Sequence, residues 1–385
     1  MKLSAKSFVI LILLCLAAIS SATFLFRENL IPLLFTPRNN IFPNSTTINT
    51  PISKDSKDIE VVAKDLDIPW EIAFLPSGEM LVTERSGKLL KIGTQTQIIQ
   101  EIEGVKHIGE GGLLGLALHP NFDQNHFLYL YLTTQESNQI SNRVERYKFS
   151  DNALSERKII LTGIKGSSNH DGGRIAFGPD NYLYITTGDA QNPNLSQDKE
   201  SLNGKILRIK DDGTIPIDNP FGNAVYSLGH RNPQGIVWDQ NNSLWATQHG
   251  PSGLQTGYDE INFIRKGANY GWPIIKGDEK KDNLTSPVLQ SGSRDTWAPA
   301  GLIYWDGSLF FAGLKGEALY EAKIKKDNKL TLTAHFKNEF GRIRTIVLGP
   351  DGNFYIATSN TDGRGKVLTG DDKIIRISPN LLGIN

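Results

Sequence analysis

One local pattern recurs six times along the chain and limits the folds that the chain can adopt. Each copy has two or three apolar residues, a turn rich in Pro, Asp, Asn or Gly, and then an alternating apolar strand. The copies begin at Ile72, Leu116, Ile175, Ile236, Leu302 and Ile346. Their spacing of roughly 45 to 65 residues suits a four-stranded sheet with variable loops. The chain is therefore expected to form six similar β-sheets in succession.

Six such sheets arranged in a ring form a β-propeller, so the predicted fold is all-β with six blades. A large β-sandwich is the alternative, but a ring accounts better for the near-regular repeat. A ring also brings the equivalent loop of every blade to one central mouth, where ligands are expected to bind.

Composition supports an ordinary globular protein. The chain has 385 residues, no formal net charge and 39% hydrophobic residues, which argues against a disordered or nucleic-acid-binding protein. The 37 Gly and 18 Pro residues, with few long helical patterns, favour a turn-rich all-β protein.

The N-terminal segment resembles an export signal. Two lysines precede the apolar run 8–18, and small residues ending at Ala22 offer a cleavage site. Because apolar character resumes at Phe24, residues 1–22 are predicted to be a signal peptide or an uncleaved membrane anchor. Cys15, the only cysteine, lies in this segment, so the folded domain is expected to have no disulfide.

Residues 23–58 contain several prolines and a run of Asn, Ser and Thr without a sustained period, which predicts a disordered linker. The propeller domain is expected to span residues 59–385. The predicted location is the periplasm or the extracellular space, with membrane attachment if the N-terminal segment is retained.

The third copy of the pattern is flanked by a histidine and an aspartate. His170 precedes its first strand, Pro-Asp-Asn at 179–181 supplies the turn, and Asp189 follows its second strand. An antiparallel hairpin returns to the edge that it left, so the two side chains should lie close together. The pair suits a general base with an orienting carboxylate. The alternative is that both are ordinary loop residues.

Four cations lie in loops that flank the fourth, fifth and sixth copies: Arg231, Lys315, Arg342 and Arg344. Together at one mouth of a neutral protein they favour a polyanionic ligand, because guanidinium groups bind carboxylate or phosphate bidentately. Arg342 and Arg344 are two positions apart in an extended segment and should point the same way. The alternative for each is a solvated surface charge.

Several motifs together resemble the soluble glucose/sorbosone dehydrogenase family, from about Ile59 to Ile377. They are Gly-Gly-Leu-Leu-Gly-Leu-Ala at 111–117, Asn-His at 169–170 with Gly-Arg at 173–174, Gly-Asp at 188–189, Leu-Gly-His-Arg-Asn-Pro-Gln-Gly at 228–235, Gly-Pro at 250–251, Asp-Glu-Ile-Asn at 259–262, Asn-Tyr-Gly-Trp-Pro at 269–273 and Arg-Ile-Arg at 342–344. The resemblance implies a six-bladed propeller that uses pyrroloquinoline quinone and calcium.

The resemblance also implies roles for individual residues. His170 would take the proton of the substrate hydroxyl while hydride passes to the C5 carbon of the quinone, Asp189 would orient His170, and Arg231 would support the charge that develops on the quinone oxygens. The implied cofactor-binding residues are Glu110, Asn169, His170, Arg231, Asn232, Lys315, Arg342 and Arg344.

Calcium is implied at two places. Backbone carbonyls of Gly250 and Pro251 would hold a catalytic ion together with the cofactor, and such carbonyls leave no side-chain signature. A structural ion would involve Glu260 and Tyr270, and its third side-chain ligand stays open among Asp278 and its neighbours.

Two features depart from the family pattern. Glu110 stands where the best-known relatives have Gln, which adds a negative charge beside the cofactor. The loop 252–258 differs in length from that of the glucose enzymes. Both features bear on substrate preference, because loops around the mouth contact the sugar.

The expected activity is oxidation of the C1 hydroxyl of an aldose sugar to a lactone, with electrons passed to an unidentified acceptor. Two alternatives remain. A calcium-dependent lactonase-type hydrolase would have acidic side chains converging on the metal and no use for four cations. A non-catalytic binding propeller would have lost His170 or the pair formed by Arg342 and Arg344.

Overall fold

The computed structural model describes residues 58–251 and 256–383, which form six four-stranded antiparallel sheets. The predicted signal peptide or anchor, nearly all of the predicted linker, and residues 252–255 of the divergent loop lie outside these ranges. None of the helices in the described ranges has the length and apolar composition that a membrane crossing needs.

Five sheets are consecutive in the chain, each ordered from the ring's centre outward. The first is β2 (Pro69–Phe74), β3 (Met80–Glu84), β4 (Lys88–Ile92) and β5 (Thr96–Glu101), and the second is β6 (Leu113–Leu118), β7 (Phe127–Glu136), β8 (Gln139–Ser150) and β9 (Ala153–Lys165). The third is β10 (Ile175–Phe177), β11 (Leu183–Thr187), β12 (Lys205–Ile209) and β13 (Val225–Leu228). The fourth is β14 (Pro233–Trp238), β15 (Leu244–Gln248), β16 (Glu260–Ile264) and β17 (Leu289–Gln290), and the fifth is β18 (Pro299–Trp305), β19 (Ser308–Gly313), β20 (Ala318–Ile324) and β21 (Leu330–His335).

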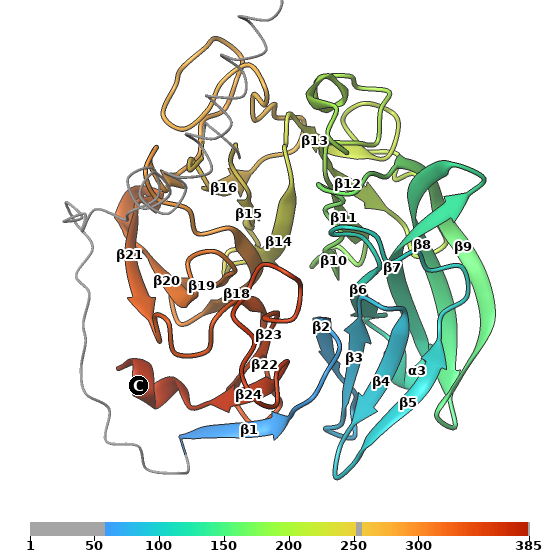
Figure 1. The fold of residues 1–385 in the computed structure, drawn as a ribbon. Helices are drawn as coiled ribbons and strands as arrows, with labels where there is room; N and C mark the ends of the chain where they lie inside the picture. The colour runs from blue at the N-terminus through green and yellow to red at the C-terminus, as the bar shows by residue number, and fades with distance from the viewer. Residues whose placement is uncertain (1–57, 252–255, 384–385) are drawn as a thin grey trace, which may run out of the picture. The chain divides into compact units, whose positions relative to one another are not determined.

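The sixth sheet joins the two ends of the folded region. Its strands are β22 (Ile343–Leu348), β23 (Phe354–Thr358), β24 (Ile374–Ile377) and, outermost, β1 (Ile59–Ala63). Strand β1 pairs antiparallel with β24, and Ile59 lies opposite Ile377 (Figure 1). The first strand of the domain therefore completes its last blade, a connection that the repeat pattern did not predict.

The blades stand in a ring around the six inner strands. Each inner strand contacts the inner strand of the next blade, in the order β2, β6, β10, β14, β18 and β22, and β22 contacts β2 (Figure 1). The six-bladed propeller prediction is confirmed. Each of the six sequence copies corresponds to the first two strands of one blade. In the third blade these strands are β10 and β11, and the Asn181 amide donates to the Gly178 carbonyl at 2.9 Å in the turn between them.

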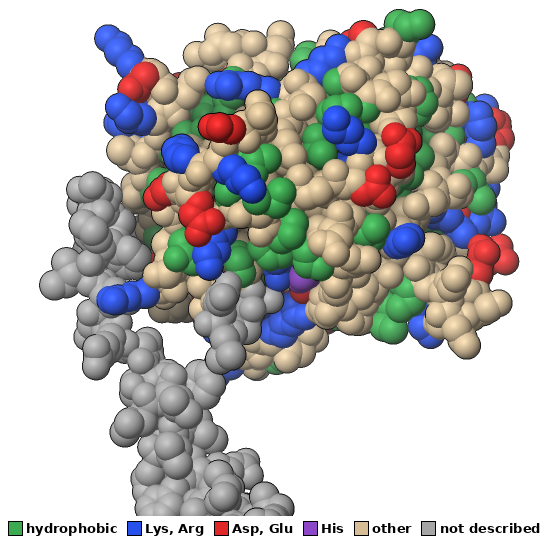
Figure 2. Space-filling view, turned by 90° about the horizontal axis from the view of Figure 1, so that it is seen from above, with side chains coloured by type: hydrophobic (Ala, Val, Ile, Leu, Met, Phe, Trp, Pro, Cys, Tyr) green, Lys and Arg blue, Asp and Glu red, His purple; other side chains and the backbone are tan. Residues whose placement is uncertain are grey.

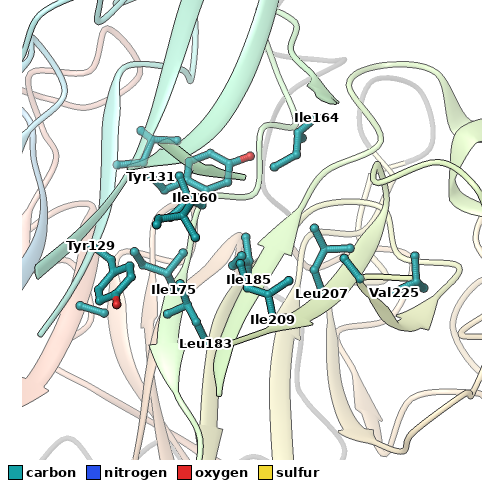
Figure 3. Packing of buried hydrophobic residues seen from close by; sticks show 14 of the residues in the cluster. Tyr129, Tyr131, Ile160, Ile164, Ile175, Leu183, Ile185, Leu207, Ile209 and Val225 are labelled. Carbon is teal, nitrogen blue, oxygen red and sulfur yellow. The ribbon is translucent and has the colours of Figure 1, made fainter. Parts of the chain in front are cut away.

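Burial decreases from the centre of the ring outward. All five residues of β3 are buried, whereas β5 in the same blade is mostly exposed. The inner strands are covered on both faces by neighbouring blades, which explains their nearly unbroken apolar runs. The core lies between blades: one cluster joins Tyr129 and Tyr131 of β7 to Ile185 of β11 (Figure 3). The short helix α3 (Phe122–Asn125) sits in the turn between β6 and β7.

Register shifts in three inner strands involve three side chains that contact one another. The register of inner strands β2, β14 and β22 shifts by one residue near the start, which leaves Trp70, Gln234 and Arg344 without a partner in the ladder. Arg344 donates to the Gln234 side-chain oxygen at 2.6 Å and lies over the Trp70 ring at 5.8 Å. Equivalent irregularities in three blades therefore place these residues together.

Charged side chains on the outer surface are mixed in sign. In the face shown in Figure 2, Lys and Arg side chains alternate with Asp and Glu among hydrophobic and neutral groups. This distribution agrees with the zero net charge of the chain.

Candidate active site

A cavity of about 510 Å³ opens where the inner strands begin. Its wall is formed by Glu110, Asn169, His170, Gln191, Arg231, Gln234, His249, Gly250, Pro251, Asp259, Thr296, Ala298, Leu314, Lys315, Arg342, Arg344 and Arg364. These residues lie in or beside loops that precede a first strand or follow a second strand. The equivalent end of several blades thus contributes to one pocket, as the propeller prediction expected.

His170 and Asp189 are in direct contact. The His170 Nδ1 atom lies 2.7 Å from Asp189 Oδ1, and Asp189 is 1% exposed. The Trp272 indole N–H donates to the other carboxylate oxygen at 2.9 Å, and the Gln191 amide donates to Oδ1 at 2.9 Å. Three donors therefore fix the carboxylate, and the carboxylate fixes the imidazole.

The backbone around His170 is closely packed. His170 has φ of +65°, in the left-handed region, and its amide donates to Glu110 Oε2 at 3.0 Å. A side chain at Gly188 would collide with the His170 carbonyl group, so only glycine allows the two loops to approach this closely. The glycine before Asp189 is thus required for the contact between the histidine and the aspartate.

Two buried guanidinium groups in the wall, those of Arg342 and Arg344, come from residues two positions apart in the sequence. Arg342 donates to Asp362 Oδ2 from Nε at 3.0 Å and from Nη2 at 2.8 Å. Arg344 meets no carboxylate in the described residues; burial lowers its pKa to about 9, so it stays charged at neutral pH. Both line the cavity, in agreement with the expected common orientation.

Arg231 and Lys315 complete the set of cations predicted from the sequence. Arg231 is 5% exposed and lies over the Trp272 ring at 5.5 Å. Burial lowers its pKa, while Asp189 and Glu110 act in the opposite direction. Lys315 is exposed at the rim of the cavity. Its backbone N–H donates to the Trp297 carbonyl at 3.1 Å.

Three buried polar atoms in and beside the cavity wall have no hydrogen-bond partner among the described residues: Asn232 Nδ2, His249 Nε2 and Arg344 Nε. Asn232 is fully buried, and its side-chain oxygen accepts the Gly172 amide at 3.0 Å. Burial lowers the pKa of His249 to about 3, so its imidazole is neutral near pH 7. Unsatisfied buried polar atoms of this kind are consistent with a polar ligand that completes the wall.

Glu110 carries a negative charge in the cavity wall, and an arginine balances it. Arg364 donates from Nη1 to Glu110 Oε1 at 2.7 Å and from Nη2 to Asn169 Oδ1 at 3.0 Å. Burial alone would raise the pKa of Glu110, but the Arg364 guanidinium and the His170 amide hold it below its usual range. Glu110 is therefore a carboxylate at neutral pH.

The Gly250 to Pro251 segment is positioned by Asp259. The Asp259 carboxylate accepts the Gly250 amide at 2.8 Å and the Trp297 and Ala298 amides at 2.6 and 2.8 Å. Burial raises the pKa of Asp259 to about 6, against the effect of these three amides. Gly250 and Pro251 both line the cavity.

Glu260 and Tyr270 do not line the cavity. Glu260 Oε2 accepts the Gln248 and Asn262 side-chain amides, each at 2.9 Å, and burial raises its pKa to about 7. The Tyr270 hydroxyl donates to the Phe263 carbonyl at 2.6 Å. Asp278 accepts the Gln290 side-chain amide at 2.8 Å. Within the described residues, no three His, Cys, Asp or Glu side chains gather as a metal site.

Sequence reasoning missed several residues of the site. Arg364 and its neighbour Asp362 lie in a Gly-rich loop after β23, Trp272 was noted only as part of a motif, and Gln191 follows Asp189 by two positions. One signal could have indicated Arg364. Its loop follows the second strand of the sixth blade, just as Asp189 follows the second strand of the third blade.

The fold and this pocket define a β-propeller protein with a cation-lined central site and a His–Asp pair. The sequence model for glucose/sorbosone dehydrogenases matches residues 66–369. The chain therefore belongs to the glucose/sorbosone dehydrogenase family, which confirms the resemblance.

Individual relatives agree with this assignment. The aldose sugar dehydrogenase of Escherichia coli K12 is 31% identical over 359 residues, covering 84% of this chain and 93% of that protein. Quinoprotein glucose dehydrogenase B of Acinetobacter calcoaceticus is 34% identical over 57% of this chain and 53% of its own length. The pyrroloquinoline-quinone-bound aldose sugar dehydrogenase of Streptomyces coelicolor is 38% identical, with a TM-score of 0.77 over 83% of this chain and 97% of that structure.

Proposed function

We propose that the protein is a quinoprotein dehydrogenase that oxidises the C1 hydroxyl of aldose sugars to lactones with pyrroloquinoline quinone and calcium. The observation that carries the proposal is the His170–Asp189 pair in the wall of a cavity lined by Arg231, Arg342 and Arg344. A base and a polyanion site thus share one pocket, as base-assisted oxidation with an anionic cofactor requires.

The donor set fits the cofactor. Pyrroloquinoline quinone carries three carboxylates, and the wall offers the guanidinium groups of Arg231, Arg342 and Arg344 with the ammonium of Lys315 at the rim. The unpartnered nitrogens of Asn232 and Arg344 would complete their hydrogen bonds on the ligand. Calcium would be held by the carbonyls of Gly250 and Pro251 together with oxygens of the cofactor.

His170 would act on the sugar through Nε2. Its Nδ1 faces the Asp189 carboxylate, so the proton sits on Nδ1 and the lone pair of Nε2 is free to accept the C1 hydroxyl proton. The developing imidazolium is stabilised by Asp189, as in other His–carboxylate pairs. When bound, the quinone supplies the two-electron acceptor for the hydride that leaves C1.

Arg231 would support the negative charge that develops during the reaction. It is buried against Trp272, the same indole that donates to Asp189. One aromatic side chain therefore positions both the general base and the stabilising cation. A fixed cation in a buried site stabilises developing charge without reorganisation.

The balance of charges disfavours the hydrolase alternative. Five cations line the cavity, including Arg364, against the two carboxylates Glu110 and Asp259. Asp259 is already engaged by three backbone amides, and Glu110 by Arg364 and the His170 amide. Neither is left to join a group of acids around a hydrolytic metal, and the retained His170 also separates this site from a simple binding propeller.

Reconstitution tests the proposal directly. Purified apoprotein is mixed with calcium and pyrroloquinoline quinone, and the quinone absorption is followed before and after addition of aldose sugars. We expect saturable binding and bleaching by sugar. Binding without bleaching by any aldose would reject the dehydrogenase assignment and favour a binding propeller, and hydrolysis of lactones without quinone would favour the hydrolase.

A further inference from the structure

A lysine ammonium is buried behind the candidate active site. Lys205, the first residue of β12, is 0% exposed and forms no ion pair in the described part of the chain. Its Nζ atom donates to three backbone carbonyls, those of Leu195 and Asn203 at 2.7 Å and that of Ser196 at 3.2 Å. An ammonium has three N–H groups, so each of them has an acceptor here. The group is therefore surrounded by carbonyl oxygens, as a bound metal ion can be.

Ser196 connects the ammonium to the segment that carries Arg231. It is the last residue of a short 3-10 helix at 193–196. Its carbonyl, besides binding the ammonium, accepts the Gly229 amide at 2.9 Å, and its hydroxyl donates to the His230 carbonyl at 2.7 Å. The next residue, Arg231, lines the cavity. The lysine thus helps to fix the backbone that presents this arginine.

Gln197, the residue after this helix, makes a second connection, to Trp272. Its side-chain amide donates to the Trp272 carbonyl at 2.6 Å and pairs with the Asn269 side-chain amide in both directions, at 3.1 and 2.7 Å. The Trp272 indole N–H donates to Asp189 at 2.9 Å. The helix end that Lys205 binds is therefore followed directly by the side chain that holds the Trp272 loop.

Asn203 makes the third and shortest connection, to the residue before Asp189. Its carbonyl binds the ammonium, while its side-chain amide donates to the Gly188 carbonyl at 3.0 Å. The Gly204 amide donates to the same carbonyl at 2.9 Å. Three routes thus lead from one buried cation to the two residues with proposed roles in the reaction, Asp189 and Arg231.

We propose that the Lys205 ammonium acts as an internal structural cation whose contacts set the positions of Asp189 and Arg231. Lys205 does not line the cavity, so it is a positioning residue and not a catalytic one. Without the ammonium, three buried carbonyls lose their donor, and the loops that carry them must rearrange to find another. The inference rests on the proposed function for its effect on turnover, but the positioning itself can be tested in the apoprotein.

The first test follows the Trp272 indole N–H by NMR in the apoprotein of Lys205→Met, which removes the ammonium and keeps an unbranched apolar side chain. The signal of Trp272 among the six tryptophans is assigned by its loss in Trp272→Phe. Burial lowers the pKa of Lys205 to about 7 and the three carbonyls favour the charged form, so spectra at about pH 6 compare the ammonium with its absence. We expect the Trp272 signal to move, while that of Trp305 in the fifth blade stays in place.

Arg208→Met is the matched control. Arg208 is a second buried cation of β12, but it binds the Asp180 and Asp218 carboxylates at 2.9 Å each and does not line the cavity. Both variants should unfold at lower urea concentrations than the parent, whereas only Lys205→Met should move the Trp272 signal. After reconstitution, Lys205→Met should also lower turnover roughly 10-fold or more, because the groups around the substrate are displaced.

Chemical rescue separates the charge from the packing. Lys205→Ala leaves a buried cavity in place of the side chain, and propylammonium matches the missing atoms with its three N–H groups. Propan-1-ol has nearly the same size but only one O–H donor. We expect propylammonium to return the Trp272 signal and turnover toward the parental values, and propan-1-ol to have little effect.

A moved Trp272 signal in Lys205→Met, an unmoved one in Arg208→Met and selective rescue by propylammonium support the proposal. An unmoved signal in folded Lys205→Met, an equal movement in Arg208→Met, or equal rescue by propan-1-ol would overturn it. If Lys205→Met does not fold, circular dichroism of Lys205→Ala decides: refolding in propylammonium alone supports the proposal, and refolding in both compounds or in neither overturns it. The expected NMR results with a failed reconstitution would reject the dehydrogenase function and leave the positioning role of Lys205 standing.

Discussion

At the scale of single residues, the proposed function assigns holding a ligand and acting on it to different side chains. Arg342 directly precedes the bulged strand β22 and Arg344 lies within it, while His170 and Asp189 belong to the loops of another blade. A base contributes mainly as the substrate loses its proton in the transition state, whereas the cations contribute already in the bound complex. Substitutions of His170 and Asp189 should therefore lower mainly turnover, and substitutions of the arginines should weaken mainly quinone binding.

His170→Gln is expected to lower turnover by about 10²-fold or more and to leave quinone affinity nearly unchanged, because a positioned base is removed while the cations stay. Asp189→Asn should lower turnover by a smaller factor, since Asp189 only orients and polarises the imidazole and the imidazole itself remains. Turnover and quinone affinity are measured for the parent and both variants at saturating calcium. Near-parental turnover in His170→Gln would make His170 a structural loop residue.

The two arginines at the start of the bulged strand should respond differently to the same substitution. Arg344→Met removes the guanidinium group that lies over the Trp70 ring and has no carboxylate partner among the described residues, so stability should hold while quinone binding weakens roughly 30-fold. Arg342→Met also strands the 3% exposed Asp362 carboxylate and should destabilise the fold by roughly 1–3 kcal/mol. The double variant should bind quinone poorly.

Urea unfolding and quinone titration measure these effects, with Arg376→Met as the control outside the mouth. Unchanged affinity in the double variant would show that the cations do not hold the ligand. An equal loss of stability in both single variants would show that breaking the contact between Arg342 and Asp362 adds nothing to the loss in the free energy of unfolding.

At the scale of elements, the site depends on how closely two loops approach. The β10–β11 hairpin is short, and its flanking loops meet where Gly188 packs under the His170 carbonyl. The hairpin pattern in the sequence was sufficient to predict that His170 and Asp189 lie at one edge. It was not sufficient to predict Trp272, which reaches Asp189 from a different blade.

Gly188→Ala should therefore disturb the base without touching its side chain. The added methyl group meets the His170 carbonyl, and we expect a loss of stability of roughly 1–3 kcal/mol together with a fall in turnover. Gly93→Ala is the control, because a methyl group there meets only the flexible side chain of Glu79. Parental turnover in Gly188→Ala would mean that the loops adjust freely and that His170 is not held by this contact.

At the scale of the whole molecule, the ring is closed by pairing the first strand with the last. Strand β1 covers β24, whose Ile374 and Ile377 are fully buried. This pairing covers the outer edge of β24 and links the two ends of the domain. The blade that supplies Arg342, Arg344 and Arg364 is thus completed by the most distant part of the folded sequence.

Truncation tests both the domain boundary and the closure. A chain that starts at Asp58 should fold with the stability of the full-length protein, since β1 is intact. A chain that starts at Leu66 should lose on the order of 2–4 kcal/mol, because β24 loses its hydrogen-bonded partner and part of its apolar cover. Urea unfolding compares the two. Equal stability would show that closure contributes little, and an unfolded Asp58 chain would place the boundary earlier.

The sequence by itself determined the number of blades, the inner strands and the His–Asp pair, because each depends on contacts between neighbouring segments. Apolar alternation and turn residues specify a hairpin locally, and a hairpin brings its own flanks together. The motif residues Arg231, Arg342 and Arg344 followed from their place next to such hairpins. Only the tertiary structure decided that β1 closes the ring, that bulges bring Trp70, Gln234 and Arg344 together, and that Arg364 compensates Glu110 from 254 positions away. Those contacts depend on the packing of blades distant in the chain, and no periodicity along the chain records which distant loops meet.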